Sequence, residues 1–422
     1  MAVTYDAVQR TAPASRDAGA RRRISPGIQR LALVFLWIAI ATGGIVYWEP
    51  APYDGLMIGS IVLLPLVGLA PLTRGLSVYL VLLSGIVAGG YIAATQAGIL
   101  SVPVTHVSIT LYLAISSVVM AAFVAHSPGA NIRLIMSAYM AAALVAAVAA
   151  LIGYFDLVPG LYDIFTEFGR ARGTFKDPNV LGAFLVPALL YAFNVVLTAR
   201  LLRGSVWAIV LPLLLLGTLL SVSRGAWLNL GVSVTVYSVF VFITAATNRE
   251  RLKLIIVMVL AGVCAVGLLA AAQSIPKVAD IMGERTTFEQ SYDVGPEGRF
   301  GGQQKAAELV VTHPLGIGAL EFGRVYHHED VHEVYLNMFL NTGWIGGTLY
   351  IFLVLTTLVL GLQLVFRERG GDGVSAVLVA AFFGMVLEGA VIDTDHWRHF
   401  HLIMAMIWGM ALARPFQARS RP

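Results

Sequence analysis

About twelve apolar stretches separate the polar residues of this chain, and they constrain its fold more than any other feature. The first begins near Leu31 and the last ends at Ala413. Each is close to the roughly 20 apolar residues that cross the hydrocarbon core of a bilayer. Only 12% of the 422 residues are charged, whereas soluble domains average about 25%. The sequence therefore predicts an all-α polytopic membrane protein with about twelve transmembrane helices and a long loop before the last three.

The apolar stretches divide the chain into a membrane domain and two tails. We expect residues 1–29 to form a basic cytoplasmic tail, 30–413 the membrane domain, and 414–422 a second cytoplasmic tail. The apolar run after the arginines at 21–23 is longer than the core of a signal peptide and lacks a clear cleavage site, so it is predicted to be a retained helix. The predicted spans lie near residues 31–48, 55–72, 76–95, 107–125, 134–155, 180–198, 205–221, 225–245, 254–272, 344–366, 374–392 and 399–413.

Basic residues fall in alternate connections, and this pattern orients the spans. With the N-terminus inside, every inner connection carries Arg or Lys, as the positive-inside rule requires. These residues are Arg74, Arg133, Arg200, Arg203, Arg249, Arg251, Lys253, Arg367 and Arg369. The outer, periplasmic connections are then 49–54, 96–106, 156–179, 222–224, 273–343 and 393–398. Because the basic residues form short scattered clusters, they argue against a nucleic-acid partner despite the net charge of +4.

Two outer connections, 156–179 and 273–343, are long enough to carry function. Loops of this length in a compact protein are usually functional or disordered. In the second loop, Gln303–Thr312 has helical character, and Pro314 then breaks the helix. The following segment, His332–Leu340, is predicted to be amphipathic and to lie at the membrane surface before the next span.

Arg224 and Arg299 are the first candidates for a functional site. Arg224 lies in the sequence SVSRG, at the junction of two spans on the outer side, where Arg is disfavoured. Its alternative role is to reach the lipid headgroups. Arg299 begins the predicted loop helix, and a helix N-terminus already favours an anion. The guanidinium fork binds phosphate oxygens in pairs. A surface charge is the competing interpretation for Arg299.

A second basic cluster lies in GRARGTFKDPN. The density of positive charge on the outer side favours anion binding by Arg172 and Lys176. Arg170 is predicted to be a solvated charge. Asn179 is the expected N-cap of the helix that follows.

His332 is the candidate general base, because an imidazole exchanges protons near neutral pH. A structural role is the more common one for a lone histidine. Residues 328–332 also spell H-E-x-x-H, a zinc-protease motif that requires a helix and a third ligand. The preceding His327 and the intervening Asp330 favour a loop end, so the metalloprotease remains a minor alternative.

The segment DTDHWRHFH at 393–401 is a further polar cluster in the last outer connection. Its side chains offer metal ligands, but we favour an interfacial belt around Trp397 that helps to line an outer cavity. Glu388 lies within a predicted span and is expected to pair with an inward-facing basic group. Cys264 is the single cysteine, so no intramolecular disulfide can form.

Four sequence segments together resemble the bacterial O-antigen ligase and Wzy-type polysaccharide polymerase superfamily. They are RGTFKDPNVLGAFL (172–185), SVSRGAWLNL (221–230), GRFGGQQKA with HPLGIGALEFG (298–323), and HEVYLNMFLNTGWIGG (332–347). Their order and spacing are similar to the family pattern from about residue 150 to 365. Glu333 departs from it, because the family usually has Asn after the histidine.

The resemblance implies a metal-independent, inverting glycosyltransferase with a GT-C-like fold and no cofactor. The implied donor is a glycan on undecaprenyl pyrophosphate, and the acceptor is another glycan or the lipid A core. The resemblance places Arg224, Arg299 and His332 at essential positions. With the basic cluster described above, the residues predicted to bind the pyrophosphate are Arg172, Lys176, Arg224 and Arg299. The resemblance also allows for polysaccharide export or chain-length partners. The implied location is the bacterial inner membrane, with the active site facing the periplasm.

Polymerase and ligase remain open within this resemblance, with a preference for polymerase because such members are more numerous in the family. A transporter or flippase of lipid-linked glycans is an alternative from another class. It predicts charged or broken helices near the bilayer midplane. Here most of the charge lies in loops, which weighs against it.

Overall fold

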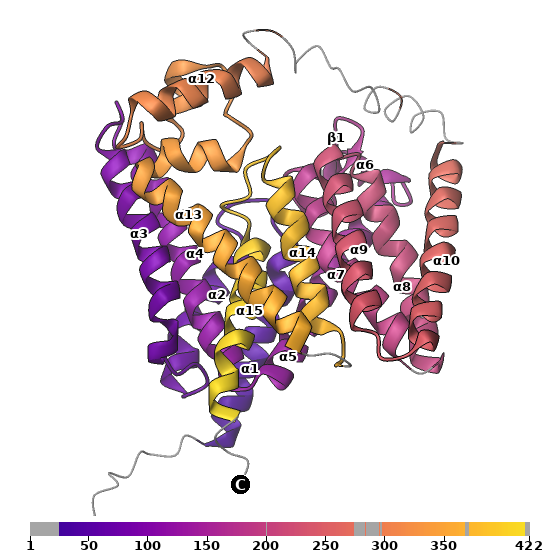
Figure 1. Ribbon diagram of the computed structural model, residues 1–422. Coiled ribbons are helices and arrows are strands. Elements are labelled where there is room, and N and C mark those ends of the chain that lie inside the picture. The colour runs from indigo at the N-terminus through magenta and orange to yellow at the C-terminus, as the bar shows by residue number, and fades with distance from the viewer. Residues whose placement is uncertain are drawn as a thin grey trace, which may run out of the picture.

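The computed structural model describes residues 25–199, 201–273, 298–367 and 371–417, together with single residues at 283 and 295. Long helices run roughly side by side through this part of the chain (Figure 1). Its only paired strands are the two-residue β1 (Thr166–Glu167) and β2 (Arg170–Ala171). The prediction of an all-α polytopic membrane protein is confirmed.

A helix covers most of each predicted span. Eight helices of the described chain are long and apolar enough to cross a membrane, and three shorter apolar helices accompany them. The helices that match predicted spans are α1 (Pro26–Ala41), α2 (Pro52–Leu66), α3 (Ser77–Ala94), α4 (Ser101–His126), α5 (Pro128–Tyr154), α7 (Pro178–Thr198), α8 (Leu201–Leu220), α9 (Arg224–Thr244), α10 (Asn248–Gln273), α13 (Val334–Arg367), α14 (Val374–Glu388) and α15 (Arg398–Gln417).

The first helix begins earlier than the sequence predicts. Ser25 caps it by accepting the backbone N–H of Ile28 at 3.3 Å, and Pro26 occupies the first turn. Proline suits this position because its missing N–H would have no helical partner anyway. Residues 26–29, expected in the cytoplasmic tail, are therefore helical, and residues 1–24 lie outside the described chain.

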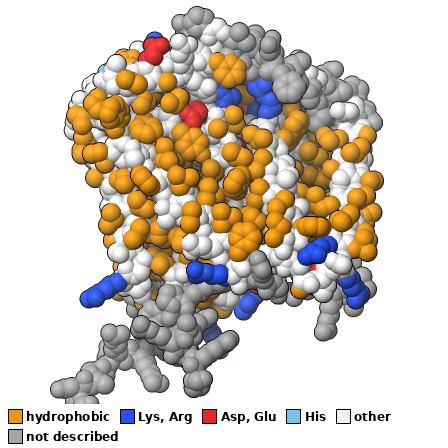
Figure 2. Space-filling view, viewed as in Figure 1, with side chains coloured by type: hydrophobic (Ala, Val, Ile, Leu, Met, Phe, Trp, Pro, Cys, Tyr) orange, Lys and Arg blue, Asp and Glu red, His pale blue; other side chains and the backbone are white. Residues whose placement is uncertain are grey.

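Helices distant in sequence pack against each other. Helix α13 lies along α3, α15 along α4, and α14 along α9. Hydrophobic side chains cover the face seen in Figure 2, and Lys and Arg side chains gather along its lower edge. An apolar belt with charged edges is the surface expected of a protein that lies in lipid.

The two long loops gather at the same end of the helices (Figure 1). The loop between α5 and α7 contains α6 (Tyr162–Phe165) and a hairpin in which Thr166 pairs with Ala171. The loop before α13 contains α12 (Arg299–Thr312) and the π-helical turn η3 (Phe322–Tyr326). The predicted helix at 303–312 is confirmed as the main part of α12. We refer to this end of the molecule as the α12 end.

Gly343 bends α13 and separates a short first segment from the long span. Its φ is +69° and its ψ is −177°, which interrupts the helix. The backbone of residues 314–317 fills the bend: Trp344 N–H donates to the Pro314 carbonyl at 2.9 Å and Ile317 N–H donates to Leu340 at 2.8 Å. A Cβ at Gly343 would lie 2.9 Å from the Pro314 oxygen, so a larger residue would push this loop away. The predicted separate segment before the span is thus present, because the bend divides it from the rest of α13.

Candidate active site

Arg299 and His332, separated by 33 positions in the sequence, are joined directly at the α12 end. Arg299 is the first residue of α12, and its Nη2 donates to the backbone oxygen of His332 at 3.1 Å. His332 has a φ of +51°, in the left-handed region that non-glycine residues rarely adopt. Strained residues of this kind concentrate at functional sites, where the surrounding contacts hold them in place.

The surroundings of His332 keep its imidazole neutral. Burial lowers its pKa below the usual value, and the Arg299 charge lowers it further. The carboxylates of Asp330, Glu329 and Asp177 act in the opposite direction. A neutral imidazole accepts a proton, which a general base near pH 7 must do.

Glu333 caps the helix that follows His332. Its carboxylate accepts the backbone N–H groups of Tyr335 at 3.1 Å and Leu336 at 2.7 Å. Burial raises the pKa of this carboxyl, and the two backbone hydrogen bonds lower it. An Asn at this position, which the resemblance implies, is also a common N-cap residue. Glu333 therefore caps the start of α13 next to His332, as an Asn at this position would also do.

Arg224 also occupies the first position of a helix. It begins α9, directly after Ser223, whose Oγ accepts the Ala226 N–H at 3.2 Å. The first N–H groups of a helix carry partial positive charge, and an Arg beside them adds a full one. Arg224 and Arg299 thus each combine a helix start with a full positive charge, an arrangement that the sequence predicts for Arg299 and that the structure adds for Arg224.

Arg170 holds the turn before α9 and is not a solvated charge as predicted. It is only 6% exposed. Its Nε donates to the Ser221 carbonyl at 2.8 Å, and its Nη2 donates to Asn179 Oδ1 at 2.7 Å. The cap of α7 is Asp177, which accepts the Asn179 N–H at 2.7 Å, so the prediction of Asn179 as N-cap is also wrong. The side-chain amide oxygen of Asn179 instead accepts a hydrogen bond from the buried guanidinium of Arg170.

The end of α14 connects the two halves of the candidate site. The carbonyl of Gly389 accepts the Val334 N–H at 2.8 Å, two residues after His332. On the neighbouring residue, Glu388 Oε2 accepts Asn229 Nδ2 of α9 at 2.7 Å. A Cβ added to Gly225 would lie 3.1 Å from Glu388 Oε1. The residues next to Arg224 and the residues next to His332 therefore contact the same helix end.

Glu388 is fully buried, and its contact differs from the expected ion pair. The described hydrogen bond of this carboxylate is to the amide of Asn229, and no partner in the described chain reaches its Oε1. A buried carboxyl group in a membrane protein is costly and usually functional. The position of Glu388 within an apolar span marks it as notable in the sequence, but no local pattern points to α9 as its neighbour.

Arg172 and Lys176 contact the segment that follows η1 (Thr42–Gly44). The Arg172 guanidinium lies 5.0 Å from the centre of the Tyr47 ring, and its Nε donates to the Ile164 carbonyl at 3.1 Å. Lys176 Nζ lies 3.0 Å from Glu49 Oε2, with both side chains about half exposed. These contacts give both residues a role in folding the loop, whereas the contact to His332 is made by Arg299.

The H-E-x-x-H sequence does not form the helix that a zinc protease needs. Residues 327–333 lie between η3 and α13 in non-helical conformations. His328 is exposed, whereas His332 is half-buried against Arg299. The two histidines of this motif bind zinc together only when a helix places them on one face. Without that helix, the H-E-x-x-H spacing does not predict a zinc site here.

The cluster at 393–401 is largely buried, and Trp397 is 7% exposed rather than part of an interfacial belt. His106, Asp395 and His396 bring possible ligand atoms within 4.8 Å of one another. The rings of His106 and His396, however, are stacked with centres 3.9 Å apart and planes 24° apart. Each imidazole binds a metal in its own ring plane, so two stacked rings cannot both direct a lone pair at one ion. The arrangement favours a polar network centred on Asp395.

Residues 207–351 match the family model described as O-antigen ligase. This part of the chain is an O-antigen ligase domain. It is about one third of the 422 residues and contains Arg224, Arg299 and His332. The predicted family is thereby confirmed for residues 207–351. No curated protein matches the chain.

The O-antigen ligase domain does not include all of the contacts described above. It ends within α13, so Glu388, Gly389 and the 393–401 cluster lie outside it, as do Arg170 and Lys176. The family supports a glycosyltransferase-like enzyme that uses lipid-linked glycan and acceptor substrates in a membrane. The residues outside the domain complete the surroundings of the candidate site.

Proposed function

We propose that this protein is an inner-membrane glycosyltransferase that moves a glycan from undecaprenyl pyrophosphate to an acceptor hydroxyl on the periplasmic side. It acts as a polysaccharide polymerase or as an O-antigen ligase. The observation that carries the proposal is the Arg299–His332 contact within a domain of the O-antigen ligase family. Two helix-start arginines and a neutral histidine are the groups that such a transfer needs.

The proposed reaction is a single displacement. The acceptor oxygen forms a bond to the anomeric carbon, and the bond from that carbon to the pyrophosphate oxygen breaks. His332 takes the proton of the attacking hydroxyl, which its lowered pKa permits at neutral pH. Because attack and departure occur on opposite sides of the carbon, the anomeric configuration inverts.

The leaving pyrophosphate gains negative charge as the bond breaks. Arg224 and Arg299, each at the start of a helix, provide fixed positive charge for it. Since these guanidinium groups supply the charge, the proposed transfer is metal-independent and uses no cofactor. Arg172 and Lys176 are proposed as weaker contacts to the same pyrophosphate, at the outer edge of the site.

The experiment is the surface-glycan profile of a strain lacking this gene, together with its lipid-linked intermediates. Survival of single repeats with loss of long chains would identify a polymerase. Long chains that accumulate on undecaprenyl pyrophosphate, with bare lipid A core, would identify a ligase. An unchanged profile in a strain without a second gene of this family would reject both.

A further inference from the structure

A cavity of about 240 Å³ lies next to the candidate site, between α1, α2, α5, α7 and α15. It is at the α12 end, because its lining includes residues 43–49 after α1, residues 175–177 before α7 and the start of α15. None of its lining residues falls within the O-antigen ligase domain at 207–351. The cavity is therefore built from the part of this chain that the family match does not cover.

Aromatic rings form much of the cavity wall. Trp397 stacks on His399 with ring centres 5.1 Å apart and planes 25° apart. Phe184 meets His399 edge-on at 5.5 Å, and Tyr139 packs on Phe184 at 4.7 Å. Flat aromatic walls suit a ligand that has an apolar face.

His399 adds a nitrogen that needs a hydrogen-bond partner to this aromatic wall. Its side chain is buried, and its Nε2 has no hydrogen-bond partner in the described chain. A buried polar atom without a partner costs about 1–3 kcal/mol. A hydrocarbon chain in the cavity would leave this nitrogen unsatisfied, whereas a hydroxyl group could satisfy it after a small shift of the buried ring.

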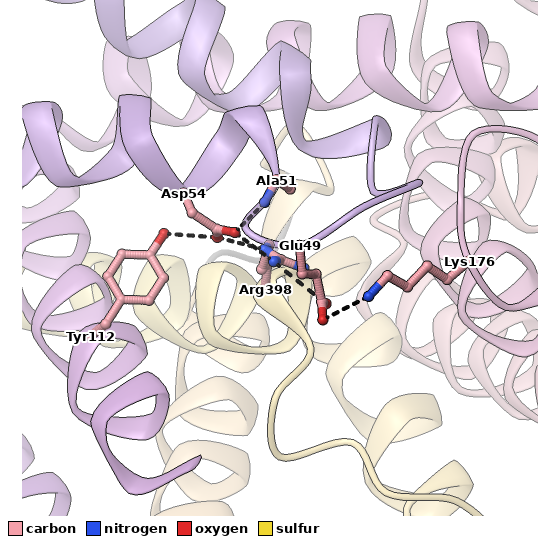
Figure 3. A network of polar contacts seen from close by, with 6 residues as sticks. All are labelled: Glu49, Ala51, Asp54, Tyr112, Lys176 and Arg398. Carbon is pink, nitrogen blue, oxygen red and sulfur yellow. Dashed lines mark hydrogen bonds and ion pairs between the residues drawn. The ribbon is translucent and has the colours of Figure 1, made fainter. Parts of the chain in front are cut away.

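Charged side chains of both signs line one part of the cavity, which we call its mouth: Glu49, Lys176, Asp177 and Arg398. Figure 3 shows the contacts that Glu49, Lys176 and Arg398 make. Lys176 pairs with Glu49 at 3.0 Å, and Arg398 binds Asp54 at 2.8 and 2.7 Å. Arg398 also lies 3.8 Å from Glu49, and Asp177 adds another carboxylate. Because Lys176 and Arg398 are already paired with carboxylates, the mouth is a weaker site for an anion than the helix starts at Arg224 and Arg299. It offers hydrogen-bond donors and acceptors to an uncharged polyhydroxyl ligand.

The size and position of the cavity limit the kind of ligand that it can take. It is smaller than the roughly 300–1,000 Å³ of drug-sized ligand sites, so it fits a single ring better than a longer molecule. Asp177 lines the cavity, and its charge acts on the imidazole of His332 by raising its pKa, so the cavity and the candidate base share this neighbour. Arg224 and Arg299, the main groups proposed to hold the donor pyrophosphate, are not among its lining residues, whereas Lys176, proposed as a weaker contact, lies at its edge.

We propose that this cavity is a sugar-binding subsite that takes one pyranose ring of the acceptor glycan. The ring stacks on the Trp397–His399 wall, one of its hydroxyls bonds to His399 Nε2, and others bond to the charged groups at the mouth. Another hydroxyl of the same acceptor then faces His332. This inference rests on the proposed function for the identity of the acceptor, but sugar binding by the cavity can be tested without catalysis.

The test uses the full chain in nanodiscs and oligosaccharide released from the surface glycan of the source strain. Val180 lines the cavity and Val195 lies on the same helix outside it, so Val180→Phe fills the cavity and Val195→Phe is the matched control. Saturation-transfer NMR should show contact with one ring in the wild type and in V195F, and at least a fivefold weaker signal in V180F. His399→Phe, which keeps the ring but removes its nitrogens, should also weaken the signal.

Kinetics separate acceptor from donor. V180F should raise the KM for the acceptor about tenfold and leave the KM for the lipid-linked donor unchanged. Equal oligosaccharide binding by V180F, H399F and the control would overturn the subsite. An increase in donor KM alone would overturn its assignment to the acceptor. If the wild type transfers no glycan, the proposed function fails, and the binding measurement still decides whether the cavity takes a sugar.

Discussion

The guanidinium of Arg299 donates to the backbone oxygen of His332 at 3.1 Å. This contact fixes His332, the candidate base, next to one of the two helix-start arginines. It also explains why the two residues should act together: the same positive charge that can hold a leaving pyrophosphate helps to keep the imidazole neutral.

Replacing Arg299 should therefore reduce transfer strongly. Arg299→Ala removes a preorganised donor and its charge, and we expect a loss of roughly 10²–10³-fold in kcat, the usual effect of deleting one such donor. Arg299→Lys keeps the charge but not the forked geometry, so it should retain intermediate activity. Transfer rates in proteoliposomes would measure both variants, with equal rates for wild type and R299A counting against the site.

The pH dependence of transfer should report His332. Because burial and Arg299 lower its pKa, the base stays unprotonated to a lower pH than a free histidine, and activity should fall only when the pH drops through this lowered value. Asp177→Asn removes a charge that raises the pKa, so the acid limb should move to still lower pH. Asp177 also caps α7, so the fold of the variant is checked by its melting temperature. An unchanged limb in a folded D177N protein would show that another group controls it.

Glu388 should position the start of α9 through Asn229. Glu388→Gln can still accept the Asn229 amide, so we expect activity within a fewfold of the wild type. Glu388→Ala removes the acceptor and leaves a cavity beside Gly225, and we expect at least a tenfold loss of kcat. The measurement that tests this role is the difference in kcat between the folded E388Q and E388A proteins at saturating donor. Equal loss in both would mean that the carboxylate charge, rather than the hydrogen bond, is required.

Asp393 should make stability depend on pH. Burial, together with the nearby Asp395 charge, raises its pKa to about 7, and Asn337 donates to it at 2.9 Å. The folded state therefore holds this proton more tightly than the unfolded state, so the contribution of Asp393 to stability falls as the pH rises from about 4 to about 7. Asp393→Asn removes this loss. The melting temperature of the variant relative to wild type should be higher at pH 8 than at pH 5, and a constant difference would contradict the assignment.

Periodic apolar stretches predicted the helices well, because each span must satisfy its backbone hydrogen bonds internally in lipid. Helix α1 and the cap of α7 show the limits of that prediction. Ser25–Pro26 and Asp177–Pro178 both start helices, and in each case a polar cap followed by proline determined the start more strongly than the apolar pattern.

The candidate site was less predictable, since its contacts join distant segments. Arg299 and His332 could be selected by residue type, but their direct contact depends on how the loop folds over α13. Arg170 was misassigned because charge alone does not show whether a neighbour such as Asn179 will bury it. The role of Glu388 required knowledge that α14 packs on α9, which no local pattern contains.

The most direct test of the account is transfer by purified protein in proteoliposomes that contain undecaprenyl-pyrophosphate-linked glycan and acceptor. The wild type should release undecaprenyl pyrophosphate and elongate or decorate the acceptor, with or without a metal chelator. His332→Ala should lower this rate by at least 10²-fold, within the range that general-base catalysis contributes, while the protein remains folded and binds donor. A folded H332A protein that transfers glycan at the wild-type rate would contradict the central claim.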